Sequence, residues 1–421
     1  MNIKMKLASA PTFVLALYAA IVIFLTYTCC YAYRRPFTAG IYAEETLAGF
    51  DLKILYVLAQ IMGFAVSKFL GTRILPTLPS NKRIHRLAGM LVFCEFTWLG
   101  FAVLPPILKL FCVFLSGIPL GLTWGLLFSL VEGRRISEVL NVGLSTALIL
   151  ASGLVKSLGQ FVLDSLHVAE YWMPFVTGAL ALPFVLLCCY LLSLIPAPNA
   201  TDISLRTVRK PMTPVQQNQF VRQFFMGICL LTILHATLTV FRELRDAFTA
   251  DFWEELNLTD SLIFTKTEYP IAFIVLLLMF LIVFIRSNRK ALNVIYVITA
   301  LGCIITIGAT LMYMNGYVNP VTWMILSGLG LYMGFIPFTY MVERLIAAMH
   351  ISATTVFILY LADSFGYVGT TSVFIFKNFS SVDLSWSQML IYTALGSSIL
   401  ALSSVMGCYF YFSKFKGKSI H

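Results

Sequence analysis

Long apolar stretches recur along the whole chain, and short polar or charged segments separate them. Each stretch is long enough to cross a bilayer as a helix, which takes about 20 apolar residues. The pattern predicts twelve membrane-spanning helices, near residues 12–40, 52–74, 85–105, 107–132, 140–165, 171–195, 223–247, 264–286, 290–314, 319–342, 351–376 and 386–412. We therefore expect an all-α membrane protein.

The longest polar segment lies in the middle of the chain and is basic and rich in proline. It divides the chain into an N-terminal six-helix half (1–195), a central loop (196–222) and a C-terminal six-helix half (223–421). Two repeated halves around a central substrate site are a common carrier layout. Phe13 lies 21 residues before Arg34, and Phe224 lies 21 residues before Arg245. The two halves are thus predicted to be pseudo-symmetric, with these arginines at equal depth.

Composition and charge support a membrane location. The chain is 59% hydrophobic and 11% charged, whereas soluble domains are about 25% charged. The net charge of +10 comes from basic residues in alternate connections, such as Lys82 and Arg83, Arg134 and Arg135, and the central loop. Acidic residues such as Glu44 and Glu45 fill the others. By the positive-inside rule both termini are cytoplasmic, and the short loops suggest a bacterial inner membrane.

Paired arginines in apolar surroundings are the first candidate site. Arg34 and Arg35 lie in YAYRRPFTA within the first predicted span, and Arg242 and Arg245 lie in TLTVFRELRDAF. Placing each arginine in a bilayer costs about 2.5–3.5 kcal/mol on insertion scales. Two guanidinium groups suit a phosphate or similar oxyanion, because each offers a planar fork of donors. The alternative is that the first pair ends its helix and reaches the outer surface.

Only one member of each pair is expected to face a cavity. Arg34 and Arg35 are adjacent, and neighbouring positions on a helix point about 100° apart. Arg242 and Asp246 are four residues apart, so they could neutralise each other on one turn and leave Arg245 as the cation for the site. A lone lysine, Lys68, lies in the second span; it could line the same cavity or extend to the surface.

Three carboxylates are predicted to lie within the membrane: Glu95, Glu268 and Asp363. Such groups face the bundle interior and either pair with cations or carry protons. Glu268 and Asp363 could be counter-ions for Arg245 or Lys266, and Glu95 could be a structural partner near Lys68. Proton coupling through any of the three is the alternative.

The chain resembles the major facilitator superfamily and, within it, the organophosphate:inorganic phosphate antiporters. YAYRRPF resembles that family's Y-x-x-R-K/R-x-F, which places its phosphate-binding arginine on Arg34, and GFAVSKF is similar to G-Y-x-x-S-K-F, which places its lysine on Lys68. The segment from Arg245 resembles R-x5-D-x4-L, TEYP resembles Y-E-Y with Glu268 at the acidic position, and SFGYVGT resembles F-G-Y-x-G-G/T.

Two departures change what the resemblance implies. The family's loop after the second span carries an aspartate, whereas LPTLPSNKR has none. The family's site histidine in the fifth helix has no counterpart, and Ser152 and Lys156 lie nearby instead. A site that includes Lys156 stays cationic but contacts its ligand differently, so the substrate is left open.

The predicted function is secondary transport of a small organic anion by alternating access, as organophosphate/phosphate exchange. Arg34, Arg245, Lys68, Arg35 and Lys156 would bind the substrate, and Glu268, Asp363, Glu95 and Asp246 would set the charge balance. A proton-coupled carrier of a carboxylated or sulfonated solute, or a sugar-phosphate sensor with a transporter fold, are the alternatives. We expect no cofactor, metal, enzyme activity or nucleic-acid partner; the partners are the anion, inorganic phosphate among the candidates, and the bilayer, with the chain acting as a monomer.

Overall fold

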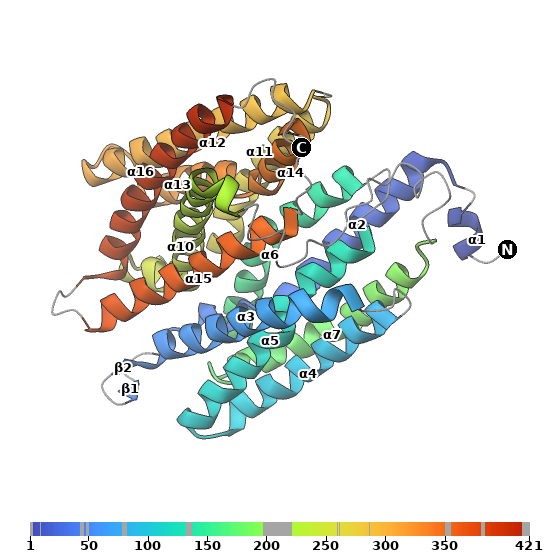
Figure 1. Ribbon diagram of the computed structural model, residues 1–421. Helices are drawn as coiled ribbons and strands as arrows, with labels where there is room; N and C mark the ends of the chain where they lie inside the picture. Colours follow the sequence, from blue (N-terminus) through green and yellow to red (C-terminus); the bar gives the residue numbers. More distant parts are fainter. Residues whose placement is uncertain are drawn as a thin grey trace. The chain divides into compact units, whose positions relative to one another are not determined.

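A computed structural model of the chain describes residues 3–8, 10–42, 46–47, 50–77, 82–131, 137–196, 221–258, 260, 262–285, 287–349, 355–379 and 384–414 (Figure 1). Most of these residues are helical. The first part contains α1 (Ile3–Ala8), α2 (Thr12–Tyr31), the 3-10 helix η1 (Pro36–Ala39), α3 (Leu52–Thr77), α4 (Arg83–Val103), α5 (Pro106–Val131), α6 (Ser137–Asp164) and α7 (Met173–Ser193). The second part contains α10 (Phe225–Glu255), α11 (Ile263–Val283), α12 (Asn288–Met314), α13 (Pro320–Phe335), α14 (Phe338–Met349), α15 (Thr355–Phe379) and α16 (Trp386–Ser413).

The only sheet in the described part of the chain is a pair of two-residue antiparallel strands, β1 (Thr46–Leu47) and β2 (Phe50–Asp51). Eleven helical segments among the described residues are long and apolar enough to cross a membrane, with α13 and α14 counted as one. The helix α3 occupies the remaining predicted span. The chain is thus a multi-pass membrane protein, as its hydropathy predicted. Most of the central loop, Arg134, Arg135, Glu44 and Glu45 lie outside the described residues.

The chain forms two compact units. The first comprises Met1–Arg206 with Asp246–Tyr269, and the second comprises Thr207–Arg245 with Pro270–His421. The helix α10 therefore belongs to both units: its residues up to Arg245 lie in the second unit, and those from Asp246 onward lie in the first. Phe248, just past this change, has non-helical backbone angles (φ −116°, ψ 18°). The division into halves at 196–222 stays a prediction.

Three predicted spans end elsewhere in the structure. The first stops at Tyr31 instead of residue 40: the chain turns and continues into the 3-10 helix that begins at Pro36, a residue that has no N–H to extend an α-helix. The seventh continues to Glu255 rather than residue 247. The tenth is interrupted between α13 and α14, next to Pro337, whose missing N–H breaks the helical hydrogen-bond ladder.

Glycines bring helices close together within each unit, as small residues do in membrane bundles. In the first unit, a Cβ added at Gly63 of α3 would lie 2.3 Å from the carbonyl oxygen of Phe114 in α5 and 2.9 Å from Cα of Gly117. In the second unit, a Cβ at Gly330 of α13 would lie 2.3 Å from the carbonyl oxygen of Gly302 in α12. Each contact holds two backbones closer than any side chain allows.

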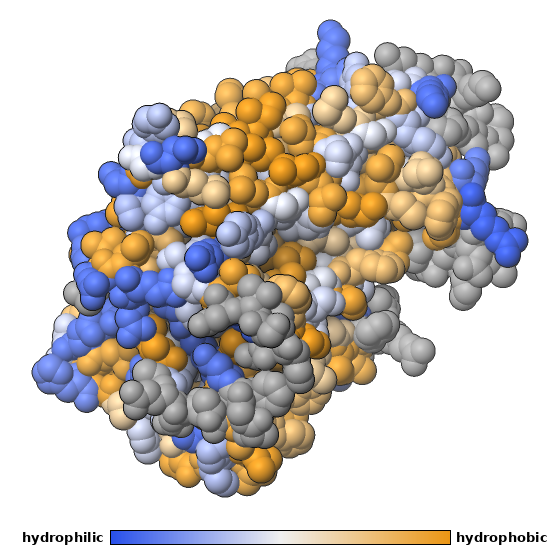
Figure 2. Space-filling model, turned by 90° about the vertical axis from the view of Figure 1, so that its left-hand side faces the viewer, coloured by the Kyte–Doolittle hydropathy of each residue, from blue (hydrophilic) through white to orange (hydrophobic). Residues whose placement is uncertain are grey.

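Large apolar side chains also cover much of the protein surface. Figure 2 shows hydrophobic residues gathered over one face, and Phe13, Phe184 and Phe284 are exposed by 76%, 63% and 66% of their surface. In water such a surface would drive association, whereas lipid tails are as apolar as these side chains. These exposed apolar side chains therefore suit contact with lipid.

Candidate functional site

The turn after α2 carries the paired arginines of the first span, and neighbouring helices fix it in place. Nε1 of Trp98 donates a hydrogen bond to the carbonyl oxygen of Tyr33 (2.9 Å). The Tyr33 hydroxyl donates to the carbonyl oxygen of Gly178 (3.1 Å). These bonds tie the turn to α4 and α7 and set the directions of the two arginines that follow.

Arg34 lies half-buried on aromatic rings. Its Cζ is 4.5 Å from the ring centroid of Phe64 in α3 and 5.4 Å from that of Tyr31. A guanidinium over an aromatic face gains about 0.5–1 kcal/mol at exposed sites and about 2 kcal/mol or more when it is desolvated. The rings therefore stabilise the positive charge of Arg34.

Arg35 takes a different direction and pairs with Asp246 of α10. Its Nη2 lies 3.0 Å from Oδ2 of Asp246, and both side chains are buried. The other carboxylate oxygen, Oδ1, lies 4.0 Å from Nζ of Lys156 and accepts a hydrogen bond from the Ser152 hydroxyl (3.3 Å). All four residues belong to the first unit. One buried carboxylate thus serves two buried cations.

The Arg242–Asp246 pair expected from their spacing stays a prediction. Arg242 contacts Glu243, with Nη2 2.5 Å from Oε1, and its Cζ lies 4.6 Å from the ring centroid of Phe335. Asp246 contacts Arg35 and Lys156, which reach it from distant parts of the sequence. Spacing on one helix did not indicate any of these contacts.

Arg245 is buried in the second unit against the backbone of α13. Its Nη2 donates to the carbonyl oxygen of Met324 (3.3 Å). A Cβ added at Gly328 would lie 2.7 Å from that Nη2 and 2.9 Å from Cζ. The glycine therefore makes the space that the guanidinium occupies.

Two other predicted residues lie on helices of the first unit. Lys68 is half-buried on α3. Glu268 of α11 is buried against α6, where a Cβ added at Gly153 would lie 2.8 Å from its Cγ. Glu268 was suggested as a counter-ion of Lys266, but Lys266 pairs with Asp260 (2.5 Å), and both of these side chains are well exposed.

Glu95 is the least compensated of the predicted carboxylates. Both of its oxygens are buried, and neither has a hydrogen-bond partner among the described residues. The carboxylate lies against α7, where a Cβ added at Gly178 would be 2.2 Å from Oε2, and Tyr33 lies beside the same glycine.

Sequence analysis missed one buried pair and one partly buried pair. Nζ of Lys53 lies 2.5 Å from Oδ2 of Asp251 in the first unit; Lys53 lies at the start of the second predicted span, and Asp251 had been assigned to the connection after the seventh. In the second unit, Nε2 of His235 lies 2.9 Å from Oδ1 of Asp363. His235 lies in the apolar run LLTILHATL, which resembles ordinary core sequence. An ionisable side chain inside a predicted span was the signal that could have singled it out.

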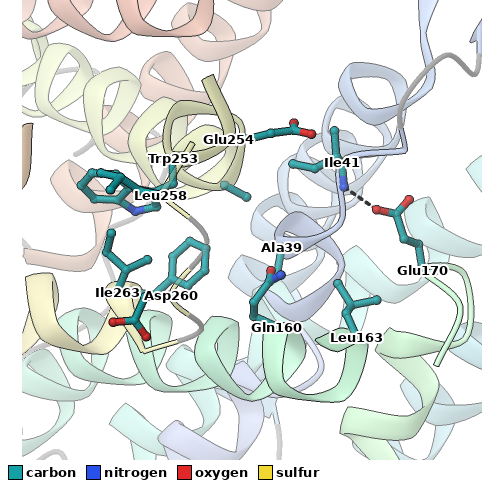
Figure 3. Close-up of a pocket in the computed structure, with 12 residues that line it drawn as sticks. Ala39, Ile41, Gln160, Leu163, Glu170, Trp253, Glu254, Leu258, Asp260 and Ile263 are labelled. Carbon is teal, nitrogen blue, oxygen red and sulfur yellow. Dashed lines mark hydrogen bonds between the residues drawn. The ribbon is translucent and has the colours of Figure 1, made fainter. Parts of the chain in front are cut away.

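A pocket of about 170 Å³ lies in the first unit (Figure 3). Part of its lining comes from residues of α10 and α6 that follow Asp246 and Lys156 in the sequence, such as Ala250 and Gln160. Its lining includes the acidic residues Glu170, Glu254 and Asp260. Glu170 accepts hydrogen bonds from the backbone N–H groups of Ile41 and Tyr42, both at 2.9 Å. Acidic walls do not suit an anion, so this pocket is separate from the predicted anion site.

The chain belongs to a family of unknown function, DUF5690, whose model matches residues 36–415. No curated protein matches it by sequence.

Solved structures of transporters share its fold at low identity. A point mutant of the nucleoside transporter NupG aligns with a TM-score of 0.60 at 14% identity, covering 94% of this chain and all of that one. The D-xylose-proton symporter aligns with a TM-score of 0.62 at 14% identity, covering 98% and 100%. A bacterial homolog of the human lysosomal transporter Spinster aligns with a TM-score of 0.58 at 12% identity, covering 95% and 97%.

These likenesses confirm the predicted all-α membrane fold of the major facilitator kind. The narrower resemblance to organophosphate antiporters stays a prediction, as do the roles of the individual site residues.

Proposed function

We propose that this protein is a secondary transporter that carries a small organic anion across a membrane by alternating access, in exchange for inorganic phosphate. The observation that carries the proposal is the sharing of Asp246 by Arg35 and Lys156. Two buried cations that converge on one carboxylate concentrate positive charge in an apolar bundle, where charge is costly. An anion that enters this region lowers that cost.

The chemistry of the cations favours an oxyanion with several oxygens. Guanidinium groups bind carboxylate and phosphate through parallel N–H donors. Arg34 stays charged on the rings of Tyr31 and Phe64, and Arg245 is fixed on α13. In this proposal Arg34 and Arg245 bind the anion, Lys68, Arg35 and Lys156 add positive charge, and Glu268, Asp363, Glu95 and Asp246 set the balance.

Exchange follows from the same charge balance. A carrier whose site gathers several cations is stabilised by a bound anion in each state that it passes through during transport. Coupling requires such a difference in ligand stabilisation between states. Transport itself is proposed here by analogy with the fold, because the structural relatives are a nucleoside transporter, a sugar–proton symporter and a homolog of a lysosomal transporter. Both termini are placed on the cytoplasmic side in this proposal.

Exchange of labelled phosphate in liposomes preloaded with unlabelled phosphate tests the proposal. Arg34→Ala and Arg245→Ala are expected to abolish exchange, whereas Arg289→Ala, an exposed position at the start of α12, is expected to leave it unchanged. Arg34→Lys keeps the charge and the contact with the rings and is expected to retain part of the activity. A folded wild-type protein that exchanges no phosphate would reject this function and favour a proton-coupled carrier or a sensor.

A further inference from the structure

We propose that the pocket in Figure 3 is a second ligand site, which binds a small ammonium compound that also carries a hydroxyl or carbonyl oxygen. This site goes beyond the proposed transport of an anion and does not depend on it. Two features of the pocket carry the proposal: the charge of its walls and a buried hydrogen-bond donor that has no acceptor.

The polar walls of the pocket are acidic. Glu170, Glu254 and Asp260 line it, and none of the described residues that line it is basic. Asp260 is paired with Lys266, which leaves the other two carboxylates as the source of negative charge. Glu170 accepts two backbone N–H groups, and Glu254 is exposed. Carboxylates form their strongest hydrogen bonds with charged donors, so this lining favours a cation.

Trp253 supplies the buried donor. Its side chain is 1% exposed, and its Nε1 is buried without a hydrogen-bond partner among the described residues. Figure 3 shows the indole at one side of the pocket, with its nitrogen on the edge that faces the space between the labelled residues. An indole N–H can donate a hydrogen bond but cannot accept one. A ligand that satisfies Trp253 therefore has to supply an oxygen acceptor.

The two features together select one chemical class. A simple cation satisfies the carboxylates but cannot accept the N–H of Trp253, and an anion accepts that N–H but meets acidic walls. A molecule with both an ammonium group and an uncharged oxygen satisfies each. In Figure 3, Glu170 lies across the pocket from Trp253. The ammonium group therefore donates to Glu170 and Glu254, while the oxygen accepts from the indole.

The size and the apolar walls of the pocket limit the ligand further. The volume of about 170 Å³ is smaller than the roughly 300–1,000 Å³ of pockets for drug-sized molecules. Ala39, Ile263 and Phe264 supply apolar surface for a short carbon chain. A small amino alcohol fits these limits. The same chemistry occurs free in solution and in the ethanolamine headgroup of a phospholipid, so the experiment has to distinguish these two sources.

Fluorine NMR can follow the pocket directly in the whole protein. The six tryptophans are replaced by 5-fluorotryptophan, and the protein is placed in nanodiscs of phosphatidylglycerol, a lipid without an ammonium group. The Trp253 signal is identified by its loss in Trp253→Phe. Ethanolamine hydrochloride is expected to shift this signal until the site is saturated. Sodium chloride and magnesium chloride at the same ionic strength are expected to leave it in place.

A second probe and two variants separate the contributions of the two features. Propylamine hydrochloride has the ammonium group without the hydroxyl, and it should bind about two- to tenfold more weakly, the range of one neutral hydrogen bond. Glu254→Gln should weaken ethanolamine binding about two- to fivefold, as expected for an exposed charge. Glu255→Gln is the matched control, because Glu255 is exposed but is not one of the twelve residues that line the pocket.

If Trp253→Phe does not fold, the signal whose shift is weakened by Glu254→Gln and not by Glu255→Gln identifies the indole. Three results would overturn the site: no saturable shift with ethanolamine, an equal shift with either salt, or equal binding of the two Glu→Gln variants. Propylamine that binds as tightly as ethanolamine would overturn the role of Trp253, and water would then be the acceptor of its N–H.

Nanodiscs of phosphatidylethanolamine identify the source of the ligand. A Trp253 signal that is already shifted in this lipid, and that added ethanolamine no longer moves, assigns the pocket to a lipid headgroup. A signal at the same position as in phosphatidylglycerol, still moved by added ethanolamine, assigns it to a free amino alcohol. Both results support the chemical class of the ligand, and they differ only in where the ligand comes from.

Discussion

Arg35 and Asp246 form a buried ion pair across 211 residues of sequence, with Nη2 3.0 Å from Oδ2. Their side chains are 2% and 1% exposed, and Lys156 approaches the second carboxylate oxygen. Asp246 therefore contacts two cations, which reach it from the turn after α2 and from α6. Loss of its charge leaves both cations buried without this compensation.

The substitution Asp246→Asn is expected to destabilise the protein strongly. Removal of one partner of a buried ion pair costs about 3–5 kcal/mol, because the remaining charge is left in an apolar environment. The free energy of unfolding in detergent measures the effect. The additional change Arg35→Met should recover part of the loss, because it removes one of the two buried cations that Asp246 contacts. A double variant no more stable than Asp246→Asn would contradict this explanation.

Asp260→Asn is the matched exposed substitution and is expected to change stability by less than about 1 kcal/mol. A hydrogen bond from Lys266 holds the pKa of Asp260 below its usual range. The contribution of the pair is therefore present at neutral pH and is lost as the pH falls through that lowered pKa. Thermal unfolding of wild type and Asp260→Asn should differ slightly at neutral pH and converge in acid. High salt should also remove the difference, because the pair is exposed.

Hydropathy predicted the helices because a segment that crosses lipid must be apolar and must form its backbone hydrogen bonds within a helix. The predicted ends are wrong where a local feature of the sequence ends or extends a helix. The first span ends early at the turn before Pro36, and α10 runs on to Glu255 although its second half is rich in charge. The charged residues of this second half can stay buried within the helix because Asp246 pairs with Arg35 and Asp251 pairs with Lys53.

The partners of the charged residues are what sequence could not supply. Arg35 was singled out from its position, but nothing near it indicates a partner 211 residues away. His235 and Asp363 are 128 residues apart, and only the packing of α10 with α15 brings them into contact. Sequence analysis therefore found most of the charged positions and missed most of the pairs they form.

Glu95→Gln is expected to leave the protein as stable as wild type or to stabilise it. Both carboxylate oxygens are buried without a hydrogen-bond partner in the described part of the chain, so the charged form gains little from its surroundings. The amide has the same shape and no charge to bury. Thermal unfolding at neutral pH measures the change. A marked loss of stability would mean that the carboxylate makes a contact the amide does not reproduce.

Gly328→Ala is expected to impair the anion site while the protein remains folded. The new Cβ would lie 2.7 Å from Nη2 and 2.9 Å from Cζ of Arg245, and 2.6 Å from Cδ1 of Ile271, so the guanidinium must move away from the Met324 carbonyl. Gly308→Ala is the control, because it is also a helical glycine of the second unit but has nothing within 4 Å of the added Cβ. That change should raise stability slightly, since alanine favours helix over glycine by about 0.8–1 kcal/mol. Labelled-phosphate exchange should fall sharply in Gly328→Ala and stay near wild type in Gly308→Ala. Equal exchange rates in the two variants would mean that the position of Arg245 does not matter for the anion, and Arg245 would then be a packing residue of α13.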